Sequence, residues 1–233
     1  MRCKLCHRVR SFARRREGAS TVEFAFIMPA LLVLLLAGLD TGRYVLATQR
    51  IQEVANSVAE MLSQTAAAVT PITPIVSGDG VVQDSDLHYY FDSAMATYPD
   101  VLAVANKAGT NWWQLLQVSM TSIRFKGTPN GCTTACTGYK PVVVWTTGAR
   151  TCGLAITAAL NTSTYSASTL PTGVVGPGSI IAVDVSYTFT PTFGAAFLPA
   201  IPIERSAFMA PRNVPIVESQ ATTMAPPCPN VLP

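Results

Sequence analysis

The feature that most constrains this chain is an apolar run near its N-terminus. Residues 19–39 read ASTVEFAFIMPALLVLLLAGL and contain one ionisable group, Glu23. A helix needs about 20 mainly apolar residues to cross a bilayer, and this run provides them. A cleaved secretory signal has an apolar core of roughly 7–15 residues, followed by a site with small residues. The sequence DTGRY at 40–44 fits such a site poorly, so we expect the segment to be retained as a membrane helix.

Basic residues are concentrated ahead of this run. Residues 1–18 hold seven of the 16 Lys and Arg residues, and Glu17 is the one acid among them. Positive charge flanking an apolar segment marks its cytoplasmic side. We therefore expect a cytoplasmic N-terminus, one pass through a bacterial inner membrane, and an extracytoplasmic C-terminal part. Because the rest of the chain is slightly acidic, the sequence argues against a nucleic-acid partner.

Two residues inside the apolar run need a physical reason. Pro29 removes a backbone hydrogen bond and should kink the helix. Glu23 places a carboxylate near the cytoplasmic edge of the bilayer, where an acid is costly and is by default functional, with a partner. The alternative is that Glu23 extends into the lipid headgroups and has no role.

Residues 15–24, RREGASTVEF, resemble the cleavage region of type IV pilin-like proteins. Those proteins have a basic leader, a glycine just before the cut, and glutamate as the fifth residue of the mature chain. The resemblance implies that a prepilin-type peptidase cuts after Gly18, which makes Ala19 the first mature residue and Glu23 the fifth.

A longer stretch, residues 14–65, resembles the TadE/TadG-like family, whose members are minor pilin-like components of the Tad (tight adherence) pilus system. The matching residues are Gly18, Glu23, Phe24, Pro29, Gly42, Arg43, Ala55 and Ala59, together with the leucine-rich run. Major Tad pilins are short and have Glu-Tyr near the cut. This chain is long and has Glu-Phe, which favours a minor component.

The resemblance implies a structural subunit that acts in pilus assembly and adhesion by helix packing in the inner membrane. Glu23, Phe24 and Pro29 would be its assembly residues. Its partners would be other Tad pilus and membrane components, the peptidase and the lipid bilayer. The alternative is a membrane-tethered extracytoplasmic binding module or enzyme unrelated to pilus assembly. A tether alone does not need Gly18, Glu23 and Pro29 at pilin-like spacing, so the first hypothesis is favoured.

The helix is predicted to continue past the membrane. Apolar residues recur at three- and four-residue spacing at Ile51, Val54, Val58, Met61 and Leu62, which is typical of a one-sided helix. This stripe packs on the chain's own outer domain, on neighbouring subunits, or on both. We expect a leader at 1–18, a transmembrane and extended helix at 19–65, a linker at 66–80 and an extracytoplasmic domain at 81–233.

The outer part is predicted to be α+β. A second helix is expected from 86 to 98, preceded by Asp84 and halted by Pro99. Strands are expected at 116–125, 141–146, 179–190 and 201–209. Between 181 and 189 apolar and polar residues alternate, as in a half-buried antiparallel strand. The fold class is thus a long N-terminal transmembrane helix followed by a small antiparallel sheet with one or two helices.

Four cysteines of the outer part should form disulfides outside the cytoplasm. If 116–125 and 141–146 form a hairpin, Cys132 and Cys136 lie in its loop and Cys152 lies past the far end of the returning strand. That strand is about 20 Å long, whereas bridged Cα atoms lie within about 7 Å. Of three possible connectivities, we predict Cys132–Cys136 and Cys152–Cys228.

No pattern of residues indicates catalysis, a metal or a cofactor. Cys3, Cys6 and His7 match the attachment pattern for c-type haem, but they lie in the expected cytoplasmic leader. A zinc site there would lack a fourth ligand. The other histidine, His88, has no second ligand near it in the sequence. We therefore expect that the protein is not an enzyme.

Overall fold

The computed structural model describes residues 17–68, 78–129, 132, 136–159, 166–195 and 197–229, and the side chains of all of these except 17–21. The chain forms two compact units. We call Met1–Leu46 with Thr190–Ala200 the anchor unit, and Ala47–Phe189 with Ile201–Pro233 the sheet unit. Most of the expected leader, including Cys3, Cys6 and His7, and most of the expected linker lie outside the described residues.

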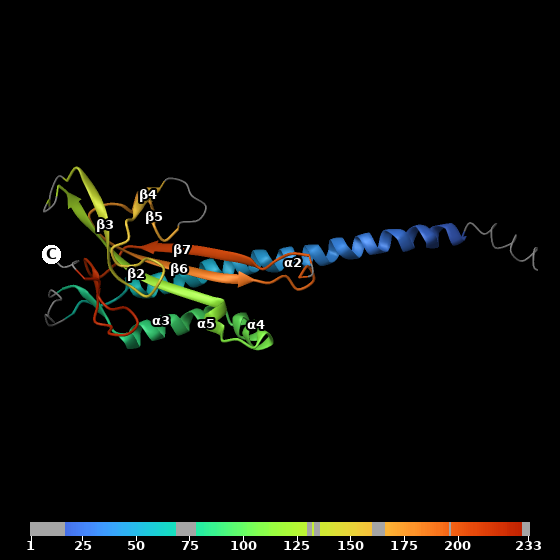
Figure 1. Ribbon diagram of the computed structural model, residues 1–233, viewed down its shortest axis with the longest axis horizontal. Coiled ribbons are helices and arrows are strands. Elements are labelled where there is room, and N and C mark those ends of the chain that lie inside the picture. The colour runs from blue at the N-terminus through green and yellow to red at the C-terminus, as the bar shows by residue number, and fades with distance from the viewer. Residues whose placement is uncertain are drawn as a thin grey trace, which may run out of the picture. The chain divides into compact units, whose positions relative to one another are not determined.

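Helix α2 runs from Glu17 to Ser63 and belongs to both units. It continues without interruption through Pro29, and the predicted kink there stays a prediction. The helix is the blue to cyan ribbon in Figure 1. It extends well past the apolar run, as the periodicity of residues 51–62 predicts.

The sheet unit is built on a four-stranded antiparallel sheet in the order β3-β2-β6-β7. Its strands are β2 (Leu116–Thr128), β3 (Gly138–Thr146), β6 (Gly178–Phe189) and β7 (Ile201–Met209). Each corresponds to a strand predicted from the sequence, and β2 and β3 form the predicted hairpin. The α+β fold class is confirmed.

One face of the sheet and one face of α2 contribute to the core of the sheet unit. On β6, Val183 and Val185 are buried and pair across to Met120 and Val118 of β2. The second half of α2 has a fully buried stripe of residues with 0% exposure: Ile51, Val54, Ala55, Val58, Ala59 and Leu62. Met61 is half-buried. The apolar stripe of α2 therefore packs inside the chain's own sheet unit.

Three helices precede the sheet in the chain (Figure 1), and the last of them contacts β2 and β6. Helix α3 spans Asp84–Thr97 and begins with a capping box in which Asp86 accepts the backbone N–H of Gln83. It starts two residues earlier than predicted. Helix α4 (Asp100–Ala108) ends at Gly109, whose φ of 65° suits glycine. Helix α5 (Trp112–Leu115) is a single turn, too short for the sequence pattern to indicate.

Two small parallel pairs were not predicted. Strand β1 (Gly80–Val82) pairs with β8 (Val217–Ser219), and β4 (Thr157–Ala159) pairs with β5 (Thr169–Pro171). A short 3-10 helix, η1 (Thr172–Val174), follows β5. Three-residue strands are too short to show an alternating pattern. The β1–β8 pair joins the C-terminal segment to the last residue of the expected linker and the two residues after it.

Two disulfides reinforce the sheet unit. Cys132 and Cys136 are bonded within the β2–β3 loop, and their Cα atoms are 5.7 Å apart. Cys152 and Cys228 join segments 76 residues apart in the chain, with Cα atoms at 5.4 Å. These are the two bonds expected from the sequence.

Candidate functional site

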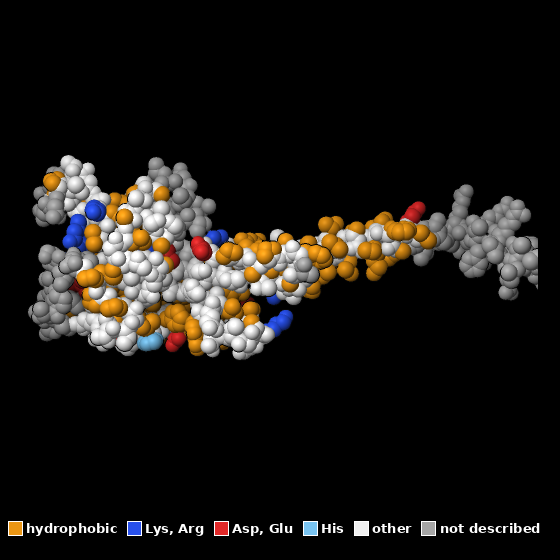
Figure 2. All heavy atoms as spheres, in the orientation of Figure 1, with side chains coloured by type: hydrophobic (Ala, Val, Ile, Leu, Met, Phe, Trp, Pro, Cys, Tyr) orange, Lys and Arg blue, Asp and Glu red, His pale blue; other side chains and the backbone are white. Residues whose placement is uncertain are grey.

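The most unusual surface of the molecule is the first half of α2. Between Val22 and Leu39 large apolar side chains are exposed, including Phe26 at 79% and Leu34 at 68%. Figure 2 shows hydrophobic side chains along this part of the helix. α2 is the one described helix long and apolar enough to cross a membrane, and its apolar window is not buried by the protein. An apolar surface of this size requires lipid or protein to cover it.

The predicted processing and assembly residues all lie on this helix. Gly18 and Ala19 are in its first turn. Glu23, Phe24 and Pro29 are exposed. Glu23 forms no hydrogen bond or ion pair with any residue that the structure describes. The structure therefore places Glu23, Phe24 and Pro29 on the uncovered part of α2 and leaves the carboxylate of Glu23 available to a partner outside the chain.

A second carboxylate, Asp40, ends the apolar run and was not singled out from the sequence. It is 7% exposed. Its Oδ1 accepts the N–H of Thr192 at 3.0 Å, and its Oδ2 accepts those of Phe193 at 3.0 Å and Gly194 at 2.7 Å. Arg43 donates to the Thr192 hydroxyl. Asp40 thereby fastens the loop between β6 and β7 to α2 within the anchor unit.

Gly194 lies at a close approach to Asp40 and to Leu198. A Cβ on Gly194 would lie 3.4 Å from Oδ2 of Asp40 and 3.2 Å from Cδ1 of Leu198. The sequence signal for the contact is weak, because an acid after an apolar run is ordinary and its partner lies about 150 residues later. Only the tertiary structure brings the two together.

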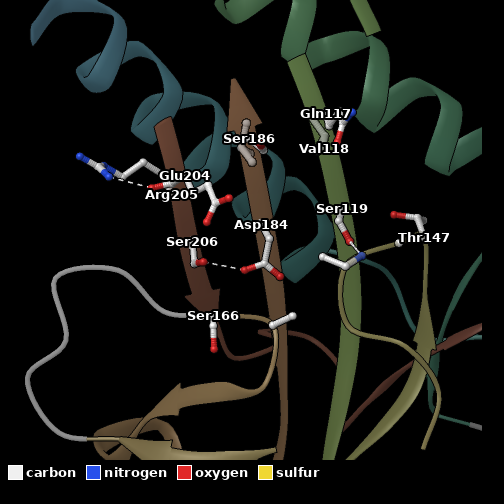
Figure 3. A pocket seen from close by; sticks show the side chains of 14 residues that line it. Gln117, Val118, Ser119, Thr147, Ser166, Asp184, Ser186, Glu204, Arg205 and Ser206 are labelled. Atoms are coloured by element: carbon white, nitrogen blue, oxygen red, sulfur yellow. Dashed lines mark hydrogen bonds between the residues drawn. The ribbon is translucent and has the colours of Figure 1, made fainter. Parts of the chain in front are cut away.

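A polar pocket of about 620 Å³ lies on the sheet (Figure 3). Its floor is the sheet face opposite the buried valines, and its walls are the loops at 147–149 and 166–167. The polar side chains that line it are Gln117, Ser119, Thr147, Ser166, Asp184, Ser186, Glu204, Arg205 and Ser206. They come from β2, β6, β7 and two loops, so no local motif could have revealed the pocket.

The charge at the pocket floor is neutralised within the protein. Arg150 is fully buried and binds Asp184 with two bonds, Nε to Oδ2 at 2.7 Å and Nη2 to Oδ1 at 3.0 Å. Its Nη1 donates to the carbonyls of Ala167 and Thr169. Ser206 also donates to Asp184, at 2.6 Å. This bidentate pair holds the pocket walls on the sheet and does not provide a free acid for catalysis.

A buried charge cluster lies where β8 meets the sheet. Arg124 Nη2 donates to Glu218 Oε1 at 2.9 Å, and Asp79 is also buried. Burial raises the pKa of the Glu218 carboxyl; Arg124 opposes this rise and the nearby Asp79 adds to it. Burial likewise raises the pKa of Asp79. The cluster joins β1, β2 and β8 and is structural.

Asp84 performs a similar fastening role at the start of α3. It accepts the N–H groups of Met224 at 2.9 Å and Thr222 at 3.0 Å. These backbone hydrogen bonds hold the pKa of Asp84 well below its usual range. Sequence reasoning assigned Asp84 only to the helix start, because its partners lie at the far end of the chain.

The described residues contain no group of three or more His, Cys, Asp or Glu that could hold a metal ion. His88, exposed on α3, therefore has no such ligand set around it in the part of the chain that the structure describes.

Within the described residues, the chain combines one helix that is long and apolar enough to anchor it in a membrane with a disulfide-bonded α+β sheet unit. The family model for TadE-like protein matches residues 18–60, so the resemblance is confirmed and this segment is TadE-like. The match begins at Gly18, includes the whole apolar run and ends within the buried stripe of α2. It associates the chain with the Tad pilus, whose TadE-like components are structural. No curated protein and no solved structure matches the chain.

Proposed function

We propose that the protein is a minor pilin-like subunit of a Tad-type pilus and secretion apparatus, acting in pilus assembly and adhesion by helix packing in the inner membrane. The observation that carries this proposal is the coincidence of two facts. The TadE-like match covers the first half of α2, and the apolar window there is not buried by the protein itself. Neighbouring subunits are therefore free to pack against it.

The proposed topology places the N-terminus in the cytoplasm and the sheet unit outside it. The basic residues before α2 support this orientation, and two disulfides are consistent with an oxidising compartment. We retain 1–18 as leader, 66–80 as linker and 81–233 as the extracytoplasmic domain, to which the end of α2 from Ala47 also contributes.

The proposed processing is cleavage after Gly18 by a prepilin-type peptidase. Gly18 has no side chain to obstruct approach to its carbonyl. Cleavage would create a positively charged α-amino group on Ala19. N-terminal sequencing of the protein from native membranes should begin at Ala19, and recovery of the intact leader from cells with an active pilus system would contradict this step.

Glu23 is the proposed recognition group. It lies four residues after Ala19, a rise of about 6 Å along the helix, so an α-amino group can come near its carboxylate. The amine belongs to the same chain or to a neighbouring subunit. Because the uncompensated acid is costly near the bilayer, pairing favours association and fixes the axial register between adjacent helices.

Close helix packing is also supported near the end of the apolar run. Gly38 and Gly42 are four residues apart on α2, and a Cβ added at either would meet nothing within 4 Å. Small residues at this spacing let two helices approach closely in a membrane. They lie away from Asp40, which is turned by about 200° from Gly38, so the fastened loop does not occupy this face.

The test is co-purification of variants with the other pilus components. Glu23→Ala and Glu23→Gln should insert in the membrane and fold normally but should lose co-purification and pilus assembly, because both lack the charge. Glu53→Gln is the matched control: Glu53 lies on the same helix, is exposed and pairs with exposed Arg50, so this variant should assemble. If both Glu23 variants co-purify like wild type and pili form, the proposal is wrong.

The second candidate function, a membrane-tethered binding module, is favoured by one observation, the polar pocket of about 620 Å³. Under this alternative Gln117 and Glu204 contact a ligand and Glu23 is unimportant. Gln117→Ala and Glu204→Gln would then abolish the cellular phenotype, while the Glu23 variants would not.

A further inference from the structure

We propose that the loop between β6 and β7, residues 190–200, is a second membrane contact whose apolar side chains enter the outer boundary of the bilayer. The partner is a lipid surface. The proposal goes beyond subunit packing, because it concerns a segment about 150 residues away from the membrane helix in the sequence.

The composition and exposure of the loop are unusual for a turn in water. Its sequence, TPTFGAAFLPA, contains no ionisable residue. Phe197 is 89% exposed, Leu198 53% and Phe193 49%. The N–H groups of Phe197 and Leu198 both bond to the carbonyl of Gly194, at 2.9 and 2.8 Å. This compact turn displays the apolar side chains on its surface, although apolar groups are favoured away from water.

The level of the loop along the helix is fixed by Asp40. Three backbone N–H groups of the loop bind this carboxylate, which directly follows the last residue of the apolar run. From Glu23 to Asp40 the helix rises about 26 Å, close to the ~30 Å thickness of a hydrocarbon core. If Glu23 lies at the cytoplasmic boundary, Asp40 and its loop lie at the opposite boundary.

The surroundings of Asp40 in the anchor unit continue the apolar belt. Val45 and Leu46 on α2 are 48% and 60% exposed. Tyr44, half-buried, lies one turn beyond Asp40, and aromatic residues are typical of the membrane–water interface. The three backbone hydrogen bonds to the Asp40 carboxylate offset the cost of placing a charge near this boundary.

Lipid is favoured over a protein partner by continuity with the exposed helix surface. A bilayer surrounds a single spanning helix on every side, so a segment fastened to that helix at the boundary meets lipid. The loop carries no charge that would select a protein partner. Glycines 38 and 42, which suit helix packing, face away from the loop.

The test measures the depth of a spin label in the full-length protein, reconstituted at low protein-to-lipid ratio in phosphatidylethanolamine and phosphatidylglycerol vesicles. Cys3→Ser and Cys6→Ser leave only the disulfide-bonded cysteines as background. Labels are placed by Phe197→Cys, by Leu34→Cys as the bilayer reference, and by Tyr89→Cys on α3 as the water reference. Tyr89 is an exposed aromatic at 66%. Collisions with oxygen report lipid, and collisions with a water-soluble nickel chelate report water.

The expected result is that the label at 197 resembles that at 34: oxygen reaches it, and nickel collisions are several-fold fewer than at 89. Adding Asp40→Ala should release the loop and raise nickel access at 197 towards the value at 89. Equal nickel access at 197 and 89 without that substitution would overturn the proposal. A label shielded from both reagents would also overturn it, because protein would then cover the loop. A water-like result at 34 would instead contradict membrane anchoring and therefore the proposed function.

Discussion

The two halves of α2 differ in how apolar residues are distributed around the helix and in what surrounds them. Between Val22 and Leu39 apolar residues occur all around the helix, and they are exposed. From Ile51 to Leu62 apolar residues occupy one side and are fully buried, while the other side carries exposed polar residues such as Glu53 and Glu60. The comparison teaches that the distribution of apolar residues around a helix indicates which medium covers it.

The largest effect should come from the long-range disulfide of the sheet unit. Replacing both Cys152 and Cys228 by Ser should lower the free energy of unfolding by about 4 kcal/mol, because the bond closes a long loop in the unfolded chain. Its sequence separation is 76. Denaturant unfolding in detergent measures this loss, while carbonate extraction should show the helix still membrane-bound.

The matched control is removal of the other disulfide, Cys132–Cys136, whose sequence separation is 4. Its shorter loop should give a loss of only about 2 kcal/mol. An equal loss in both double variants would contradict the loop-length explanation.

A pair of leucines compares the two halves of α2 directly. Leu62→Ala should cost about 3 kcal/mol of sheet-unit stability, because Leu62 is fully buried. Leu34→Ala should change that stability by less than about 0.5 kcal/mol, because Leu34 is 68% exposed in the anchor unit. The stability change of each variant is measured from the shift of its denaturant midpoint. Similar losses would show that the two halves do not differ as described.

Substitution of Asp40 tests whether this residue attaches the loop between β6 and β7 to α2. Asp40→Ala removes the acceptor for three backbone N–H groups, and bonds to a charged group each contribute about 1.5–3 kcal/mol. Hydrogen exchange at Thr192, Phe193 and Gly194 should therefore become about tenfold faster or more. Asp92→Ala, at an exposed acid on α3, is the control and should leave these amides unchanged. Unchanged exchange in Asp40→Ala would exclude the attachment.

The smallest effect concerns buried charge in the sheet unit. Burial raises the pKa of Glu218, so the folded state binds its proton more tightly than the unfolded state, whose pKa is about 4.3. The stability that this bound proton contributes is fully present below the unfolded-state pKa. It is lost as the pH rises through the folded-state pKa. Between about pH 4.5 and 7, the free energy of unfolding of Glu218→Gln should therefore decline less than that of the wild-type protein.

The carboxyl of Asp84 should change the free energy of unfolding with pH in the opposite direction. Its lowered pKa means that its stabilising contribution is present above an unfolded pKa of about 3.9 and is lost as pH falls below it. Asp84→Asn should therefore reduce acid sensitivity below about pH 4. Chemical denaturation across this pH range measures both variants, and a shift in the same direction for both would contradict these pKa assignments.

The sequence predicted the elements that have a local pattern. The apolar run, the one-sided stripe through Val58 and the alternation around Val183 each follow from the period of a single element. The cysteine pairing followed from strand length and the hairpin. What the sequence could not predict depends on partners far apart in the chain.

Three contacts illustrate this limit. Asp40 binds the loop at 192–194, Asp84 binds 222–224, and Arg150 binds Asp184 beneath the pocket. In each case the charged residue is ordinary in its local sequence, and its role exists only once the sheet has brought distant segments together. The short pair β1–β8 was missed for the same reason.

The most direct measurement is photo-crosslinking in living cells that assemble the pilus. A photoreactive phenylalanine derivative replaces Phe26, which is 79% exposed on the first half of α2. In parallel it replaces buried Val58 in the second half and exposed Tyr89 on α3 as controls. We expect crosslinks to other pilus components from position 26 and none from positions 58 and 89. Absence of such crosslinks at position 26, in cells with normal pili, would contradict assembly through this helix surface.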